Sequence, residues 1–307
     1  MPCCATCSEA CREEFHWRRL FFGIKPADRW YFTHPQWTFI RFSCFVVWKV
    51  LLAVYFVVWL GLTLVSFIAS YPTHSTHEKW LIYLTNWTYL FFVSYVVVAA
   101  INVLHEVVLK ARGVRLQRTW HFGLQWFLWN VGAPATVVVV ILFWAVLVPS
   151  DSAIVSSAAT VHVHLINGVA ILVDLFLHAM PMQLLHMYQP LVYAATYAAF
   201  TGIYFASNGT DPAGNSSIYP IITDYSHHTG LAVGADFAIV LIVIPTAWLF
   251  LWSLQKLRIW LYDNYDPHWN QRYDLERAWK AKGPTKMELA VVSQGYDLRR
   301  NSVHVSA

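Results

Sequence analysis

The chain has 307 residues, of which 57% are hydrophobic, 17% aromatic and only 12% charged. That charged fraction is about half that of an ordinary soluble domain. The composition therefore excludes a soluble globular protein, whose core would need more polar cover, and a lipid bilayer is the solvent to assume. Six runs of about 20 apolar residues are long enough to cross it as helices, and they lie near residues 45–69, 80–104, 122–148, 159–180, 187–207 and 231–254.

The predicted fold is an all-α, polytopic bundle of six transmembrane helices. Of the 21 Lys and Arg residues, six precede the first run, four lie between the second and third, and nine follow the sixth. Because cytoplasmic loops are rich in Lys and Arg, we expect both termini in the cytoplasm. The chain then divides into a Cys- and Arg-rich cytoplasmic segment over 1–43, the six-span domain over 44–256, and a cytoplasmic tail over 257–307 that is interfacial at first and then disordered.

The N-terminal segment has no short apolar core before a cleavage site, so we expect the first span to serve as the insertion signal. Four of the five cysteines crowd this segment, on the reducing face of the membrane, where structural disulfides are rare. Their spacing lacks the second ligand pair of a zinc site. Nearby arginines favour reversible S-palmitoylation over four unmodified thiols, at Cys3, Cys4, Cys7 and Cys11.

The first two spans each carry one polar residue of interest. Lys49 lies just inside the first span, where its long side chain is expected to snorkel to the membrane surface. Thr85 lies near the outer end of the second span. A threonine in a membrane helix usually bonds its own backbone one turn earlier, so Thr85 has a structural interpretation as well as a functional one.

The fourth span is the most informative. Ionisable groups in hydrocarbon cost about 3 kcal/mol each on insertion scales, so they mark functional interior surfaces by default. At about 100° per residue, the later polar residues of this span fall within about 80° of His164, and His162 points the other way. We expect a narrow polar stripe that faces a buried site, formed by His164, Asn167, Asp174 and His178.

The loop between the fifth and sixth spans is assigned to the outer side. It carries two glycosylation sequons, which begin at Asn208 and Asn215. A sequon is weak evidence alone, but two in the one long outer loop agree with the charge-based orientation. The sixth span then places Asp236 near its outer end.

Three of these residues are expected at the same depth in the membrane. Thr85, His164 and Asp236 lie at similar depths on three different spans. A hydroxyl, an imidazole and a carboxylate together can perform nucleophilic acyl transfer, because the imidazole removes the hydroxyl proton and the carboxylate fixes the imidazole tautomer. Asn167 and Thr88 are candidate oxyanion donors. His164 could instead be a neutral partner between helices, and Asp236 could simply face water.

Several short motifs carry a family resemblance, namely residues 79–85, the run from His164 to Asp174, the phrase 174–181, and residues 218–221. They resemble the androgen-induced transmembrane hydrolase superfamily and, more closely, its rolling stone branch. The superfamily implies six spans and an intramembrane Thr and His, here Thr85 and His164, that cleave fatty acid esters of hydroxy fatty acids. The rolling stone branch implies a role in myoblast fusion at the cell surface, and hence the plasma membrane rather than the endoplasmic reticulum.

Two functions stay open at this stage. The first is an integral-membrane threonine-type lipid esterase, which we favour, with a membrane lipid or long-chain ester as substrate. The second is a non-enzymatic surface protein acting in cell fusion or adhesion. We expect no metal, no cofactor and no nucleic acid partner, because the sequence lacks histidine boxes on its cytoplasmic side and paired haem ligands.

Overall fold

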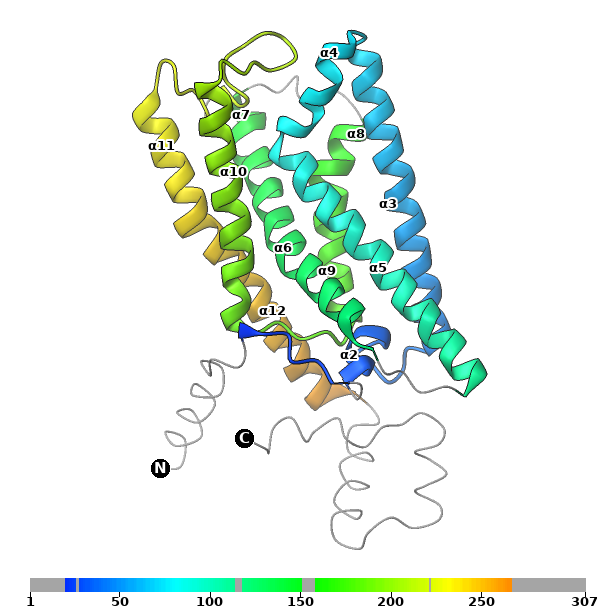
Figure 1. Ribbon diagram of the computed structural model, residues 1–307. Coiled ribbons are helices and arrows are strands. Elements are labelled where there is room, and N and C mark those ends of the chain that lie inside the picture. The colour runs from blue at the N-terminus through cyan, green and yellow to red at the C-terminus, as the bar shows by residue number, and fades with distance from the viewer. Residues whose placement is uncertain (1–19, 26–27, 114–117, 151–157, 221, 267–307) are drawn as a thin grey trace, which may run out of the picture.

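The computed structural model describes residues 20–25, 28–113, 118–150, 158–220 and 222–266. The described chain is all-α (Figure 1). Its α-helices are α2 (Arg29–Thr33), α3 (Phe42–Ser70), α4 (His74–His77), α5 (Leu84–Arg112), α6 (Trp120–Leu142), α7 (Val148–Ser150), α8 (Ala158–Val161), α9 (Asn167–Leu177), α10 (Tyr188–Ala206), α11 (Thr229–Ala238) and α12 (Ile244–Tyr265). Two 3₁₀ segments, η3 (Glu78–Ile82) and η7 (Leu184–Met187), precede α5 and α10.

Three long helices each contain a π-helical segment. Segment η4 (Phe143–Leu147) joins α6 to α7, η6 (His162–Ile166) joins α8 to α9, and η8 (Ile239–Val243) joins α11 to α12. In a π segment each amide bonds the carbonyl five residues earlier, which shifts the faces of the helix relative to one another, and such segments are frequent at functional sites.

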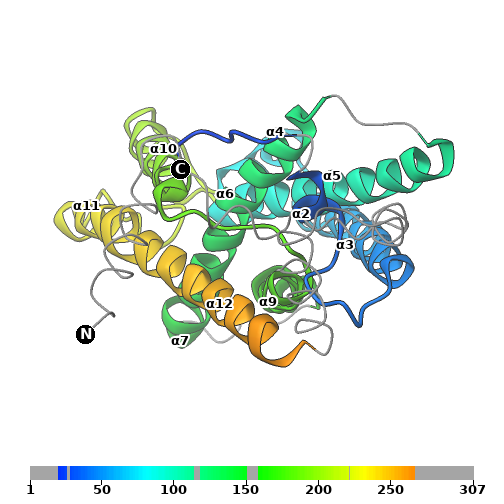
Figure 2. The same cartoon turned by 90° about the horizontal axis from the view of Figure 1, so that it is seen from below.

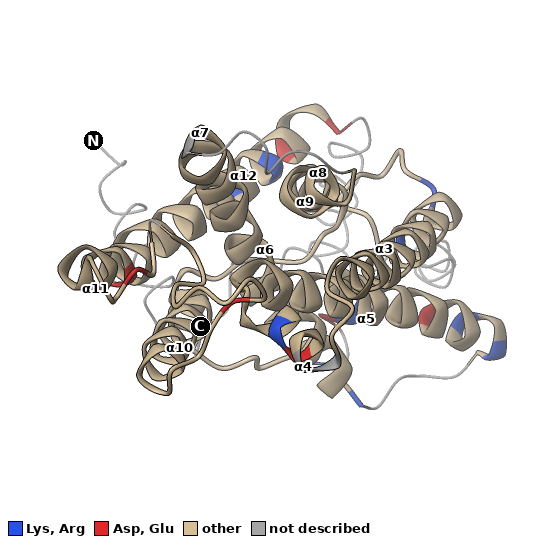
Figure 3. Cartoon of the chain, turned by 90° about the horizontal axis from the view of Figure 1, so that it is seen from above, with Lys and Arg blue, Asp and Glu red and all other residues tan. Residues whose placement is uncertain are grey.

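Among the described residues, five helices are long and apolar enough to cross a membrane: Phe42–Ser70, Leu84–Arg112, Trp120–Leu147, Ala158–Leu177 and Thr229–Tyr265. The remaining predicted span, the fifth along the chain, corresponds to α10, whose 19 residues include four tyrosines and two threonines and are less apolar. It runs alongside α6 and α11 (Figure 1). Seen from the end that carries α4, the long helices bear few Lys, Arg, Asp or Glu residues (Figure 3).

The centre of the bundle is formed by α5 and α6, with α3 against α5. Gly132 of α6 lets the two backbones approach, because a side-chain carbon there would lie 3.4 Å from the backbone nitrogen of Phe92. Small residues allow such close packing between membrane helices. The α8–α9 helix lies between α3, α6 and α12 (Figures 2 and 3), and its Ile171 and Leu175 are fully buried.

The end of the bundle opposite the α10–α11 loop is covered by the chain that precedes α3. The backbone amide of Gln36 donates to the carbonyl of Leu177 at 2.8 Å, and the indole of Trp37 donates to that of Phe176 at 2.7 Å. The amide of Thr38 donates to the carboxylate of Asp266 at 2.8 Å. Residues 29–40 of the predicted N-terminal segment thus pack on the membrane domain.

The last helix continues further than its apolar run. Trp260, Tyr262 and Tyr265, expected in an interfacial segment, lie within α12. Residues 267–307, and with them Trp269, lie outside the described residues. The segment before α3 and the end of α12 meet at one end of the bundle, where Thr38 contacts Asp266.

Candidate active site

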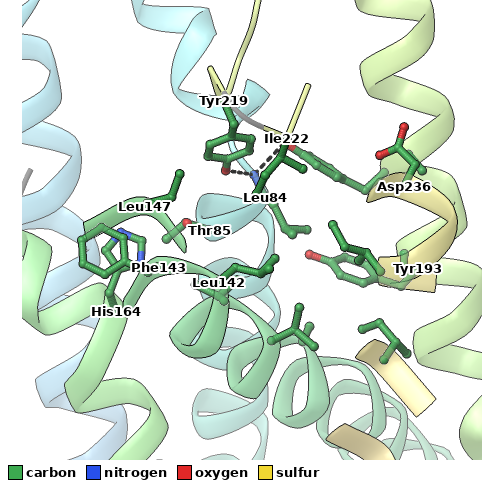
Figure 4. Close-up of a pocket in the computed structure, with 18 residues that line it drawn as sticks. Leu84, Thr85, Leu142, Phe143, Leu147, His164, Tyr193, Tyr219, Ile222 and Asp236 are labelled. Atoms are coloured by element: carbon green, nitrogen blue, oxygen red, sulfur yellow. Dashed lines mark hydrogen bonds between the residues drawn. The ribbon is translucent and has the colours of Figure 1, made fainter. Parts of the chain in front are cut away.

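A largely apolar cavity lies in the half of the bundle that carries the α10–α11 loop. The centres of water molecules can reach about 50 Å³ of it, within about 700 Å³ of space that includes the gaps between atoms and open surroundings, and its walls come from α5, α6, α10, α11, α12 and the loop before α11. The three residues predicted to share one level, Thr85, His164 and Asp236, all line it (Figure 4). Most of the remaining lining is Leu, Val, Ile and Ala, which suits a hydrocarbon chain.

All three π segments reach this cavity. Phe143 and Leu147 of η4, His164 of η6 and Ile239 of η8 line it. Register changes in three different helices therefore converge on one place. A π segment interrupts the regular hydrogen-bond pattern of an α-helix, and such segments are frequent at functional sites. Their convergence therefore makes this cavity the best candidate for a functional site in the described chain.

His164 is held by stacking. Its ring lies parallel to that of Phe143, with the ring centroids 3.7 Å apart and an interplanar angle of 3°. The backbone carbonyl of His164 accepts a hydrogen bond from the Trp144 indole at 2.9 Å. Within the described part of the chain, the Nδ1 atom of the imidazole is buried and makes no hydrogen bond. A buried ring nitrogen without a partner is free to bind a ligand or exchange a proton.

Thr85 is the second residue of α5 and belongs to a cluster of hydroxyl groups. The Leu84 amide donates to the hydroxyls of Tyr197 and Tyr219 at 2.9 and 3.0 Å, and Thr85 lies close to the Tyr219 hydroxyl. Tyr197 in turn donates to the carbonyl of Ile82 at 2.8 Å. Burial raises the pKa of Tyr219, so its hydroxyl stays a neutral donor.

Thr85 and His164 share the cavity without touching. No hydrogen bond joins their side chains in the described structure, where Thr85 lies near Tyr219 and the His164 ring packs on Phe143. Catalytic hydrogen bonds are often absent or long before a substrate binds. Proton transfer between the two would need their side chains to move into hydrogen-bond contact.

Asp236 lies on the opposite side of the cavity from His164 (Figure 4). Its carboxylate accepts a hydrogen bond from the Tyr225 hydroxyl at 2.5 Å. Burial, together with this hydrogen bond, raises the pKa of Tyr225 to about 12. Asp236 is therefore placed to interact with a ligand or with Tyr225, and the geometry does not make it the group that orients the imidazole.

The two candidate oxyanion donors lie outside the cavity lining. Asn167 bonds its own helix, because its Nδ2 donates to the Val163 carbonyl at 2.7 Å and its Oδ1 accepts from the Gly168 amide at 2.8 Å. The Thr88 hydroxyl lies 2.8 Å from that of Tyr193, and Tyr193 lines the cavity. Thr88 therefore reaches the site through Tyr193.

His162 points away from the cavity, as predicted from its helical angle to His164. Its Nε2 lies 2.9 Å from the Tyr89 hydroxyl, and its ring stacks on Trp59 with the centroids 4.3 Å apart. It thereby links the α8–α9 helix to α3 and α5. The contacts are those of a buried histidine between helices.

The predicted polar stripe is divided between two places. Asp174 bonds Lys49 at 2.7 Å through both carboxylate oxygens, and it also accepts from Tyr95 at 2.6 Å and Trp48 at 3.0 Å. The expectation that Lys49 snorkels is wrong, because its side chain is 1% exposed and paired with Asp174. His164 lies within the π segment η6 and Asp174 in the α-helix that follows it, so the change of helix type shifts their faces relative to each other and they do not meet.

Arg258 joins this second cluster from α12. Its guanidinium donates to the carbonyls of Leu175 and His178 at 2.7 Å and of Met180 at 3.1 Å. A cation at a helix C-terminus satisfies carbonyls that have no partner within the helix and opposes the helix dipole. Arg258 therefore caps α9. The cluster of Lys49, Asp174 and Arg258 ties three helices together, away from the cavity.

A family model described as protein rolling stone matches residues 8–273. The chain belongs to the rolling stone family. Protein rolling stone of Drosophila melanogaster is 27% identical over 190 residues, which cover 59% of this chain and 68% of the fly protein. No solved structure matches the chain. The resemblance inferred from the short motifs is thus confirmed, and the match includes every helix that supplies a wall of the cavity.

Sequence reasoning missed the tyrosines of this rolling stone family member. Tyr193, Tyr197 and Tyr219 line the cavity, and they supply most of its hydroxyl groups beside Thr85. Tyr193 and Tyr197 are spaced i and i+4, which places them on one face of α10. That spacing is the sequence feature that could have predicted these cavity residues. Tyrosine is common in membrane helices, however, so the spacing alone does not distinguish them.

Of the predicted modification sites in this rolling stone family member, two lie among the described residues. Asn208 and Asn215 are exposed in the α10–α11 loop, as glycan acceptors must be. The Asn215 side chain donates to Asp211 at 2.9 Å. The four cysteines proposed for lipidation lie outside the described residues.

Acid is expected to destabilise this rolling stone family member through His178. Burial holds the pKa of His178 well below its ordinary value, although the charge of Asp174 opposes the shift. Between that lowered value and about pH 6.5, the unfolded chain binds a proton that the folded chain does not, so stability falls as pH falls, by at most about 1.4 kcal/mol per pH unit for this group. Unfolding in detergent, measured from pH 7.5 to 5, should show a smaller slope in His178→Asn. An unchanged slope would exclude His178 as the source.

Proposed function

We propose that this protein is an integral-membrane esterase that uses Thr85 as nucleophile and His164 as general base on fatty acid esters of hydroxy fatty acids or similar long-chain esters. One observation carries the proposal: Thr85 and His164 line the same apolar cavity, and the Nδ1 atom of His164 is buried without a hydrogen-bond partner. The family resemblance of the two residues supports it. An apolar cavity with a few convergent polar groups is the usual form of a site for a lipid.

The reaction would proceed by two acyl transfers. The Thr85 oxygen attacks the ester carbonyl while a ring nitrogen of His164 takes the hydroxyl proton and then delivers it to the leaving alkoxide, which departs as an alcohol. Water attacks the resulting acyl-threonine, His164 takes one of its protons, and the fatty acid leaves as Thr85 recovers its own. A neutral imidazole is required at the start, and the apolar surroundings of His164 favour that form.

The first turn of α5 can stabilise the oxyanion formed in each step. The positive end of a helix dipole lies beside Thr85, and the Leu84 amide and the Tyr197 and Tyr219 hydroxyls gather there. Donors held in place before the reaction contribute most to such stabilisation. We assign Tyr219 as the donor, because its hydroxyl lies close to Thr85, whereas the Tyr197 hydroxyl already donates to the Ile82 carbonyl.

We further propose six spans with both termini in the cytoplasm, with α10 as the fifth crossing and α11–α12 as the sixth. The contact between Thr38, just before α3, and Asp266, just after α12, supports an even number of crossings between them. The distribution of Lys and Arg supports the orientation. The α10–α11 loop then lies outside, where Asn208 and Asn215 would carry glycans, and the plasma membrane is the proposed location.

Family membership supports a second candidate, a cell-surface role in myoblast fusion or adhesion without catalysis. This alternative treats the polar groups of the cavity as links between helices. The two candidates make opposite predictions for Thr85→Val: the esterase loses its function, whereas a purely adhesive protein keeps it. The cavity, lined by Thr85 and by a histidine whose Nδ1 atom makes no hydrogen bond, favours the esterase.

A covalent probe tests the proposed nucleophile. Purified protein in nanodiscs, treated with a fluorophosphonate that carries a long alkyl chain, should be labelled on the peptide that contains Thr85. Labelling should vanish in Thr85→Val and fall strongly in His164→Gln, since the base activates the hydroxyl. The control Thr196→Val removes a hydroxyl of α10 that bonds its own backbone at 2.7 Å and should label normally. Equal labelling of wild type and Thr85→Val would refute the proposal.

A further inference from the structure

The cavity is strongly unbalanced in charge. Among its described lining residues, Asp236 is the only Asp or Glu, and none is Lys or Arg. A cation at this end of the bundle, Lys79, is bound to the Thr210 hydroxyl at 2.8 Å and the Asp211 carbonyl at 2.9 Å and does not line the cavity. A ligand that carries its own negative charge would meet one carboxylate and no compensating side-chain cation.

Asp236 is held in its position. The Tyr225 hydroxyl donates to its Oδ2 at 2.5 Å, and the same hydroxyl lies 2.9 Å from that of Thr201 on α10. A hydrogen bond from a tyrosine fixes the direction of the carboxylate. The carboxylate is therefore a fixed feature of this wall, and it is not on a mobile side chain that could turn away from a ligand.

The opposite wall has the reverse polarity. Thr85 lies in the first turn of α5, at the positive end of that helix, and the Leu84 amide faces the cavity with two tyrosine hydroxyls. Figure 4 shows Thr85 and His164 away from Asp236. An ester carbonyl whose oxygen becomes negative belongs at the Thr85 wall. Whatever part of the substrate extends to the Asp236 wall must carry no negative charge.

We propose that this cavity selects esters without a negative charge, and that Asp236 is the residue that rejects carboxylate-bearing ones. The inference rests on the proposed esterase function and narrows its substrate class. Neutral long-chain esters are the ligands, whereas an ester of a hydroxy fatty acid with a free carboxylate binds weakly unless its carboxylate stays outside the cavity. Two like charges in a partly desolvated site repel enough to change affinity by about tenfold or more.

Binding of a matched pair of non-hydrolysable ligands tests this selectivity separately from catalysis. Both ligands are ether analogues of a fatty acid ester of a hydroxy fatty acid, one with a free carboxylate and the other its methyl ester. Affinities are measured in uncharged nanodiscs at pH 7.4 for wild type, Asp236→Asn and Asp224→Asn. Asp224 is a carboxylate of the adjacent loop that does not line the cavity, so its variant is the matched control.

We expect wild type and Asp224→Asn to bind the methyl ester at least about tenfold more tightly than the acid, and Asp236→Asn to reduce the ratio to about threefold or less. The two ligands partition into the nanodisc lipid to different extents, but this difference is the same for every variant and cancels when their affinity ratios are compared. Equal affinities in wild type, a ratio that Asp236→Asn leaves unchanged, or no binding of the methyl ester would each overturn the proposal. A protein that shows the ratio without hydrolysing esters would refute the esterase alone.

Discussion

Lys49→Met is expected to lower the free energy of unfolding by about 3–5 kcal/mol. Lys49 and Asp174 are 1% and 0% exposed and lie 2.7 Å apart. Removing the lysine leaves the Asp174 carboxylate buried with only the Tyr95 and Trp48 donors. Arg258 cannot replace Lys49, because its guanidinium is bound to the carbonyls at the end of α9.

The double variant Lys49→Met/Asp174→Asn separates the cost of an unpaired charge from the value of the pair. It removes both charges and keeps an acceptor for Tyr95 or Trp48, so it should be more stable than Lys49→Met alone. Unfolding by denaturing detergent can be followed through tryptophan fluorescence. The control Lys256→Met, at an exposed position of α12, should change stability by less than about 1 kcal/mol. A similarly small effect of Lys49→Met would mean that the pair is open to water.

The second large effect is expected on catalysis. Thr85→Val, which replaces a hydroxyl by a methyl group of similar size, should lower kcat/KM for a long-chain ester by at least about 10³-fold, and His164→Gln by about 10²–10⁴-fold. Because nucleophile and base act as a unit, the double variant should be little worse than the poorer single variant. The control His228→Ala, exposed in the loop before α11, should keep wild-type activity.

Independent effects of the two substitutions would contradict this assignment. If the losses from Thr85→Val and His164→Gln multiply in the double variant, the residues do not cooperate in one step. A threonine that only caps α5 would change stability and leave kcat/KM nearly intact. Measuring unfolding alongside kinetics in the same preparations distinguishes that result from loss of folded protein.

Length and hydropathy predicted the helices well where the bilayer determines them. The first span was expected near 45–69 and is Phe42–Ser70, and the third near 122–148 and is Trp120–Leu147. The start of α5 was placed four residues early, since residues 80–83 are apolar but lie in a 3₁₀ segment and turn. Hydroxyls of Tyr197 and Tyr219 meet the helix at Leu84, and such tertiary contacts leave no local trace.

The sequence predicts how deep the candidate site residues lie in the bundle, but it does not predict which side chains they contact. Counting residues along three spans placed Thr85, His164 and Asp236 at one level, and all three line the cavity. The partners came from elsewhere: Phe143 for His164 and Tyr225 for Asp236. The predicted polar stripe assumed that each residue rotates by 100° about the helix axis, as in an ideal α-helix. A π segment breaks that rule, so the prediction wrongly grouped His164 with residues of a separate cluster.

The most direct test of the central claim is the rate at which the purified protein hydrolyses a neutral long-chain ester, compared with that of Thr85→Val in the same nanodiscs at equal folded concentration. We predict measurable turnover by wild type and a loss of at least about 10³-fold in the variant. Hydrolysis at the wild-type rate by Thr85→Val, or none by the wild type, would contradict the assignment of this cavity as a threonine esterase site.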